Sequence, residues 1–220
     1  AGLYNIQVTP SYYLLTKEGY VIKQMVFENK PESVEDFFAG YNPLVEEIAE
    51  YENTISAARS GKTEDRLAAI NRLFEKTDPQ LRYLLADFCS DYIKLDKKNS
   101  TGMVGSYVVA LANSNAVQHY LDQDPLAASE EFATAAKSKF LEPEQKQQCL
   151  YTAAYLFASS GTDDAAKVKD YLQKAYDVAP DSEYAESILS MMRMMEEKYG
   201  ENAEPSADAH APEAKDSAEN

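Results

Sequence analysis

Residues 143–180 read PEQKQQCLYTAAYLFASSGTDDAAKVKDYLQKAYDVAP and carry the most regular pattern in the chain. Apolar residues recur there at the three- and four-residue spacing of amphipathic helices. Small residues such as Ala153 and Ala154 would let two helices approach closely, while larger residues fill the groove between them. A turn over residues 159–162 separates the two halves, and Pro180 stops the second half because proline cannot continue a helix. The segment therefore predicts two antiparallel helices.

The same helical signal extends outward over most of the chain, from residue 30 to residue 199. Proline recurs near the expected helix starts, often with Asp or Ser just before it, as is typical of helix N-termini. The connections are short, which favours antiparallel neighbours. The helices that we expect cover residues 31–40, 43–60, 64–76, 79–95, 102–121, 125–140, 143–159, 163–178 and 182–199.

The region before residue 30 has a different character. Residues 11–16 and 20–26 are rich in β-branched and aromatic types and flank a Lys-Glu-Gly turn, which predicts a β-hairpin. The continuous apolar run YYLL over residues 12–15 is typical of a strand that is covered on both faces. An isolated hairpin is only marginally stable in water. Either the helices cover this hairpin, or partner strands precede Ala1.

Composition restricts the partners. The 37 acidic and 21 basic residues give a formal charge of -16, which repels nucleic-acid phosphates and anionic lipid surfaces. No apolar run is long enough for membrane insertion. We expect protein or peptide partners, and the oligomeric state stays open. Residues 201–220 consist mainly of Ala, Glu, Asp, Ser and Pro, so we expect a disordered acidic tail.

No residue pattern predicts catalysis or metal binding in this chain. Cys89 and Cys149 belong to no Cys-x-x-Cys pair and no zinc cluster, and we interpret both as buried residues, with a disulfide between them as the alternative. His119 and His210 have no second His or Cys at metal-ligand spacing. We therefore expect no catalytic residue, no metal and no cofactor.

Two further patterns have a structural and a functional interpretation. The four methionines within residues 191–195 could form an adaptable peptide-binding surface, but the apolar residues around them favour packing of the last helix. Gly102 and Gly105 lack the Gly-Lys-Ser/Thr ending of a phosphate loop. We interpret them as a close helix contact or a weak helix start.

The helical region resembles tetratricopeptide-repeat (TPR) proteins. The stretch YLQKAYDVAP, residues 171–180, is similar to the second helix of such a repeat, with its large apolar residue, its Ala and its terminal Pro. Residues 63–96 could be a degenerate copy, because Phe74 and Pro79 align, but Asn71 replaces the apolar residue. An irregular helical bundle with one repeat-like unit is an equal alternative.

The first residues resemble the second half of a thioredoxin fold. The stretch YNIQVTPSYYLLTKEGYVI, residues 4–22, has the Thr-Pro pair, hydrophobic strand, Gly turn and second strand of that half, and the helix with Phe37 follows where the last helix belongs. The resemblance implies that Pro10 is a cis proline and that Thr9 and Pro10 bind substrate. The Cys-x-x-Cys half is missing, so no thiolate is available for disulfide exchange.

Together these patterns predict a mainly α chain with three parts: a partial thioredoxin-like hairpin and helix (1–41), a TPR-like antiparallel bundle (42–200) and the tail (201–220). The resemblance implies the C-terminal portion of a thiol-disulfide oxidoreductase of the thioredoxin family, which serves cell redox homeostasis but is not redox-active by itself. The alternative is a non-enzymatic TPR-like scaffold for protein binding. The first interpretation implies the periplasm or cell envelope, with the cytoplasm left open.

Overall fold

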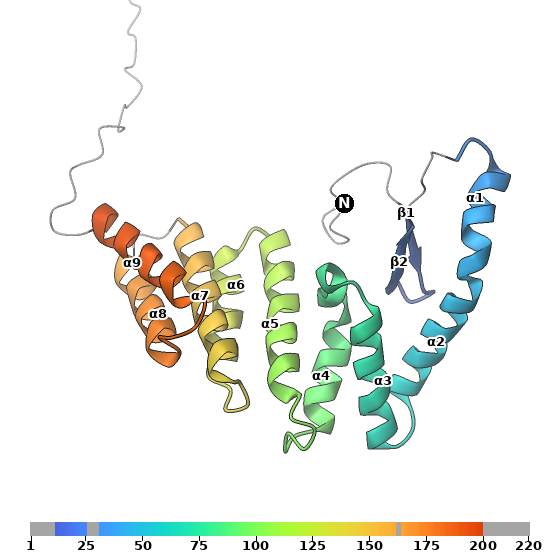
Figure 1. Cartoon of the computed structure of the whole chain (residues 1–220), viewed down its shortest axis with the longest axis horizontal. Coiled ribbons are helices and arrows are strands. Elements are labelled where there is room, and N and C mark those ends of the chain that lie inside the picture. Colours follow the sequence, from blue (N-terminus) through green and yellow to red (C-terminus); the bar gives the residue numbers. More distant parts are fainter. Residues whose placement is uncertain (1–11, 26–30, 162–163, 200–220) are drawn as a thin grey trace, which may run out of the picture.

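The chain is mainly helical, as predicted, with one small sheet near its N-terminus (Figure 1). The computed structural model describes residues 12–25, 31–161 and 164–199. Strands β1 (Tyr12–Leu15) and β2 (Val21–Met25) form a two-stranded antiparallel sheet in these ranges. The helices are α1 (Val34–Tyr41), η2 (Asn42–Leu44), α2 (Val45–Arg59), α3 (Thr63–Lys76), η3 (Pro79–Leu85), α4 (Ala86–Leu95), α5 (Val104–Leu121), α6 (Pro125–Ala135), α7 (Pro143–Ser159), α8 (Ala165–Val178) and α9 (Ala185–Tyr199).

Local sequence explains where several helices begin. The Ser33 side chain accepts a hydrogen bond from the Asp36 N–H, and the Asp36 carboxylate accepts one from the Ser33 N–H, which forms a capping box. Asp124 and Asp164 cap α6 and α8 through the backbone N–H groups three residues on. Gly102 has a φ of 76°, so the chain turns there and α5 begins at Val104 rather than at residue 102.

The predicted helix over residues 79–95 is divided in the structure. Its first part is the 3-10 helix η3, and only Ala86–Leu95 form the α-helix α4. Leu81 and Leu85 are buried, at 6% and 1% exposure, and anchor η3 to the helices around it. The expectation was therefore right about helical structure and wrong about its type in this segment.

The helices follow one another along the molecule, and their packing contacts join mainly consecutive elements (Figure 1). Among the described residues, this packing forms two hydrophobic cores. The first core lies among the hairpin, α2, α3, α4 and the start of α5, and the second lies among the rest of α5 and α6 to α9. Helix α5 belongs to both, because Val104 and Tyr107 pack in the first core while Ala112 and Ala116 pack in the second. No helix in the described part of the chain is long and apolar enough to cross a membrane.

The helices cover part of the hairpin. Leu14 and Ile22 are buried and belong to the first core. The strand register shifts between Leu14 and Leu15, where a bulge interrupts the pairing. Leu15 is 40% exposed, so the expectation of a strand covered on both faces is wrong at this end of β1.

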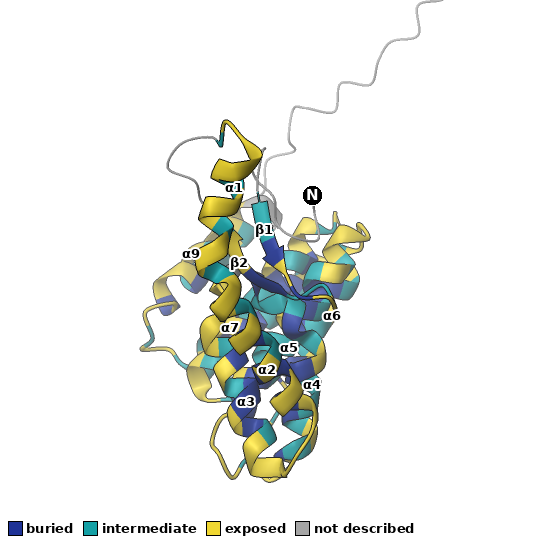
Figure 2. Cartoon of the chain, turned by 90° about the vertical axis from the view of Figure 1, so that its right-hand side faces the viewer, coloured by how far each residue is buried: buried dark blue, intermediate teal, exposed yellow. Residues whose placement is uncertain are grey.

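Helix α1 extends beyond the body of the molecule and has no buried residue (Figures 1 and 2). Val34 is 65% exposed and Phe38 is 49% exposed. The helix contacts the hairpin through Phe37, whose ring centroid lies 5.5 Å from that of Tyr12. Apolar side chains at this end of the molecule therefore lack cover from the described residues.

Candidate functional site

One candidate site is a groove of about 600 Å³ between α3, η3, α5 and α7, which we call the amide groove. Its apolar lining comes from Phe74, Met103, Tyr107 and Val109. Three helices each contribute one amide side chain, since Asn71 lies on α3, Asn113 on α5 and Gln148 on α7. The remaining lining residues are Glu75, Pro79, Arg82, Tyr83, Ser106 and Ala110.

Helix α5 forms one side of the amide groove because of its periodicity. Met103, at the N-cap of α5, together with Ser106, Ala110 and Asn113, follows the three- and four-residue steps that place side chains on one helix face. Small residues at Ser106 and Ala110 leave space along this face. The Met103 side chain is 42% exposed, so it presents apolar surface to solvent at this side of the groove.

The floor of the amide groove is fixed by aromatic packing. Tyr107 is 2% exposed and stacks on Tyr92 with ring centroids 3.8 Å apart. Phe74 meets Tyr107 edge-on at 4.9 Å, and the Arg82 guanidinium lies 5.6 Å from the Phe74 ring centroid. The Tyr107 hydroxyl donates a hydrogen bond of 2.6 Å to Asn71 Oδ1. This bond orients the Asn71 amide within the amide groove.

Burial makes the groove tyrosine a poor acid. Removal from water raises the pKa of Tyr107 well above its ordinary value. The hydroxyl therefore stays protonated at neutral pH and acts as a donor to Asn71. The chemistry on offer in the amide groove is neutral hydrogen bonding beside apolar and aromatic surface, together with one carboxylate, Glu75, and one guanidinium, Arg82.

Close packing at Gly105 fixes the junction between α5 and the loop before α7. A Cβ atom at Gly105 would lie 2.3 Å from the Phe140 carbonyl oxygen, so only glycine fits there. Nearby, Gln145 Nε2 donates to Ser106 Oγ at 3.1 Å. Gly105 thus makes a close contact, but mainly with the loop before α7 rather than with another helix, and this contact positions the α5 and α7 sides of the amide groove.

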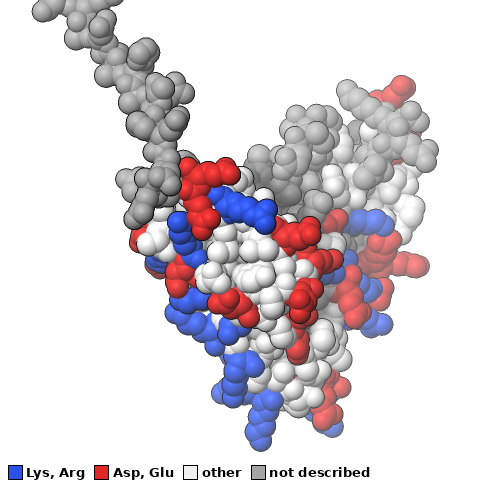
Figure 3. Space-filling model, turned by 60° about the vertical axis from the view of Figure 1, so that its left-hand side comes forward, with Lys and Arg blue, Asp and Glu red and all other residues white. Residues whose placement is uncertain are grey.

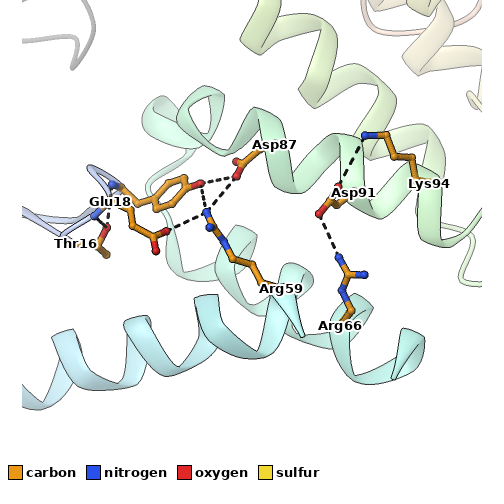
Figure 4. Close-up of polar contacts among 8 residues, drawn as sticks. Thr16, Glu18, Arg59, Arg66, Asp87, Asp91 and Lys94 are labelled. Carbon is orange, nitrogen blue, oxygen red and sulfur yellow. Dashed lines mark hydrogen bonds and ion pairs between the residues drawn. The ribbon is translucent and has the colours of Figure 1, made fainter. Parts of the chain in front are cut away.

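A second polar cluster joins the hairpin to the helices (Figure 4). The Arg59 guanidinium on α2 lies 3.0 Å from the Glu18 carboxylate and 3.6 Å from the Asp87 carboxylate. It also donates to the Tyr20 hydroxyl at 2.9 Å, and Tyr20 donates to Asp87 at 2.5 Å. Burial and the bond to Asp87 raise the pKa of Tyr20 above its ordinary value. This cluster fixes the hairpin turn against α2 and α4, and it offers no nucleophile.

The residues predicted to bind substrate, Thr9 and Pro10, lie outside the described residues, as does His210. Both cysteines are buried and free, so the structure contains no disulfide between them. Burial raises the pKa of the Cys89 thiol to about 12 and that of Cys149 to about 11. Both thiols therefore stay protonated and unreactive at neutral pH, which agrees with their interpretation as buried residues.

Other sequence predictions have mixed outcomes. Met191, Met192 and Met195 pack against the second core, which confirms the packing interpretation for three of the four methionines, while Met194 is 56% exposed. His119 lies 3.5 Å from the Glu131 carboxylate. No group of His, Cys, Asp and Glu side chains in the described residues is arranged to hold a metal ion.

The sequence interpretation missed the amide groove. One signal was present, because Asn71 stands where a repeat-like pattern would have an apolar residue. The structure shows why a polar residue is accommodated there, since Asn71 lines the groove and accepts the Tyr107 hydrogen bond. The positions of Asn113 and Gln148 gave no signal, because exposed amides on helices are common.

Comparison with known proteins finds a family model that matches the C-terminal part of the chain. Residues 103–201 match a family described as "Uncharacterised protein C-terminal domain". An "Uncharacterized protein" of Treponema pallidum (strain Nichols) is 31% identical over 88 residues, which cover 40% of this chain and 29% of the relative. The match thus spans less than a third of that relative's length. No solved structure matches the chain. The residues that match the family run from the start of α5 past the end of α9, which is the region of the second core.

Proposed function

We propose that this chain is a non-enzymatic, TPR-like scaffold that binds an extended, mainly apolar segment of a partner protein in the amide groove. The observation that carries the proposal is that α3, α5 and α7 each contribute one amide side chain to the lining of a single groove. An Asn or Gln side chain can donate to a carbonyl and accept from an N–H at once. Several such side chains in one groove suit the backbone of an extended peptide.

The rest of the lining fits the same ligand. Met103, Phe74 and Val109 provide apolar surface for side chains of the segment, and methionine adapts its shape to different partners. The single carboxylate and the single guanidinium in the lining leave the groove without a strong net charge. A segment that is neutral and apolar therefore fits better than a strongly charged one.

The test is a selection of peptides from a random displayed library against the full chain, followed by affinity measurement by fluorescence anisotropy. Replacing one amide removes a hydrogen bond of about 0.5–1.5 kcal/mol, so Asn113→Ala should weaken the selected peptides by about 2- to 12-fold. Met103→Asp should weaken them further, because it places a charge on the apolar side.

The matched control is Gln118→Ala, which removes an exposed amide on the same helix, outside the amide groove. It should leave the affinity unchanged. The proposal is wrong if the library yields no binder, or if the selected peptides bind the groove variants and the parent chain equally well.

A second function is favoured by the N-terminal end. We propose that the hairpin and α1 close a thioredoxin-like domain of a longer thiol-disulfide oxidoreductase, with Thr9 and Pro10 in its substrate loop. The order of β1, β2 and α1, with Phe37 against Tyr12, fits the closing half of that fold. The exposed side chains of Leu15, Val34 and Phe38 provide an apolar surface on which further elements of that domain would pack.

This second proposal is tested by comparing the longer gene product with residues 1–220. Leu15→Asp should cost the longer protein about 1–3 kcal/mol of stability, because it buries a charge, and should cost the shorter chain little. The longer protein should also reduce insulin disulfides, and Cys→Ser changes in its Cys-x-x-Cys motif should abolish this activity. Equal effects of Leu15→Asp in both proteins, or a longer product without that motif, would refute the proposal.

A further inference from the structure

A second groove, of about 660 Å³, lies between α6, α7 and α8 and differs in charge from the amide groove. Four lysines line it, in a chain whose formal charge is -16. They are Lys137, Lys146, Lys167 and Lys174. On the face shown in Figure 3, Lys and Arg side chains are frequent along the lower left edge, with Asp and Glu side chains among them and on the opposite side. We call the groove that these four lysines line the lysine groove.

The carboxylates of the lysine groove are already engaged. Asp170 lies 2.6 Å from Lys174, and Asp177 accepts a hydrogen bond of 2.8 Å from Gln173. Among the described residues, no ion pair joins Lys137, Lys146 or Lys167 to a carboxylate. Three ammonium groups are thus available to a negatively charged ligand in one groove.

The position of Lys167 is fixed by aromatic rings. Its ammonium lies 4.5 Å from the centroid of Phe157 and 5.9 Å from that of Tyr171. Such contacts hold a cation over the face of a ring without neutralising its charge. Lys167 is therefore a positioned charge at the edge of the groove.

The floor of the lysine groove is apolar. Leu150, Tyr171 and Val178 line it together with the small residues Ala133 and Ala136. A polyphosphate or nucleic acid would match the lysines but would leave this apolar surface uncovered. A peptide segment can match both features, with an apolar side chain on the floor and carboxylates beside the lysines.

We propose that the lysine groove binds an acidic segment of a partner protein in which a large aliphatic or aromatic residue is flanked by Asp or Glu. Two observations favour this ligand: its carboxylates complement the lysines that form no ion pair among the described residues, and its apolar residue matches the apolar floor between them. The chain's own residues 201–220 meet only the first condition, because they carry six carboxylates but no apolar residue larger than Ala and Pro. This surface is separate from the amide groove. It favours an acidic segment, whereas the amide groove favours a neutral one.

The experiment uses the full chain and a fluorescein-labelled synthetic octapeptide with one Leu and one Phe among six glutamates, measured by fluorescence anisotropy. The double variant Lys146→Glu with Lys167→Glu should weaken binding by at least tenfold. The matched control Lys62→Glu with Lys98→Glu makes the same charge change at exposed lysines elsewhere. It should change the affinity by less than threefold.

Three further probes separate the possible occupants. An octapeptide with Gln in place of Glu, one with Ala in place of Leu and Phe, and a peptide of residues 201–220 should all bind at least tenfold more weakly. Equal weakening by both double variants would mean that only net charge matters, and it would overturn the proposal. Tighter binding of the 201–220 peptide would make the tail the occupant and would overturn it as well.

Discussion

The two cores of the molecule are built from different side chains. The first core packs large residues, including Tyr51, Phe88, Tyr92 and Ile70, around the hairpin and α2 to α5. The second core is rich in alanine. Its buried alanines are Ala112, Ala116, Ala128, Ala135, Ala136, Ala153, Ala154 and Ala175. Small residues let helices approach closely, so that successive helix pairs can pack in the same geometry. Large side chains instead require a packing arrangement that is specific to each position.

This difference explains why the repeat-like pattern was clear only in the C-terminal half. Closely paired helices require small residues at regular positions, and residues 143–180 show this pattern in the sequence. Aromatic packing in the first core leaves no such pattern, and one of its helices is the 3-10 helix η3. The family match to residues 103–201 covers the alanine-rich half.

The largest expected effect is a truncation in the first core. Phe88→Ala removes a ring that is 1% exposed and packs against Tyr20 at 5.3 Å. It should lower the free energy of unfolding by about 3–5 kcal/mol, because the surrounding large residues cannot close the cavity. Urea unfolding monitored by circular dichroism measures this. A loss below 1 kcal/mol would mean that the first core is loosely packed.

The converse change tests the second core. Ala153→Leu adds volume at a fully buried position on α7, where the backbone carbonyl already accepts a bond of 2.7 Å from Ser129 Oγ. It should destabilise the chain by about 1–3 kcal/mol through overpacking. Ala166→Leu, at an exposed position of α8, is the matched control and should have an effect near zero. Similar melting temperatures for both variants would contradict close helix pairing.

A smaller effect is expected at the hairpin. Arg59→Ala removes the contacts to Glu18, Tyr20 and Asp87 that attach the turn to α2 and α4. Because these charges are partly exposed, we expect a loss of about 1 kcal/mol rather than a large one. Hydrogen exchange should become faster in residues 13–24 and stay unchanged in α8. Unchanged exchange in the hairpin would show that apolar contacts alone hold it.

The smallest effect concerns the two thiols, one in each core. Their raised pKa values, about 12 and about 11, keep both protonated at pH 8, so Ellman's reagent should not label the folded chain. Both should react fully in guanidinium chloride. A group with a raised acid pKa contributes less to stability above its unfolded pKa, so their contribution falls as pH rises above about 8.5. Rapid labelling of the native chain would contradict this burial.

Much of the fold was predictable from local chemistry. Proline at Pro125 and Pro143 and the Lys-Glu-Gly turn placed α6, α7 and the hairpin within a few residues. The division of residues 79–95 was not predictable, because α and 3-10 helices place apolar residues at similar short spacings.

The candidate site was much less predictable. The amide groove joins Asn71, Asn113 and Gln148, which are far apart in sequence and come together only through helix packing. The lysines of the second groove are likewise spread over the loop after α6 and the helices α7 and α8. Thr9 and Pro10 carried the one site prediction, and it stays a prediction because they lie outside the described residues.

The central claim is that the amide groove holds an extended segment of a partner. Hydrogen exchange of the full chain with and without a selected peptide tests it most directly. We predict slower exchange in residues 71–83 and 103–113, and no change in α8. Protection that appears only outside these two segments, or nowhere, would contradict the claim.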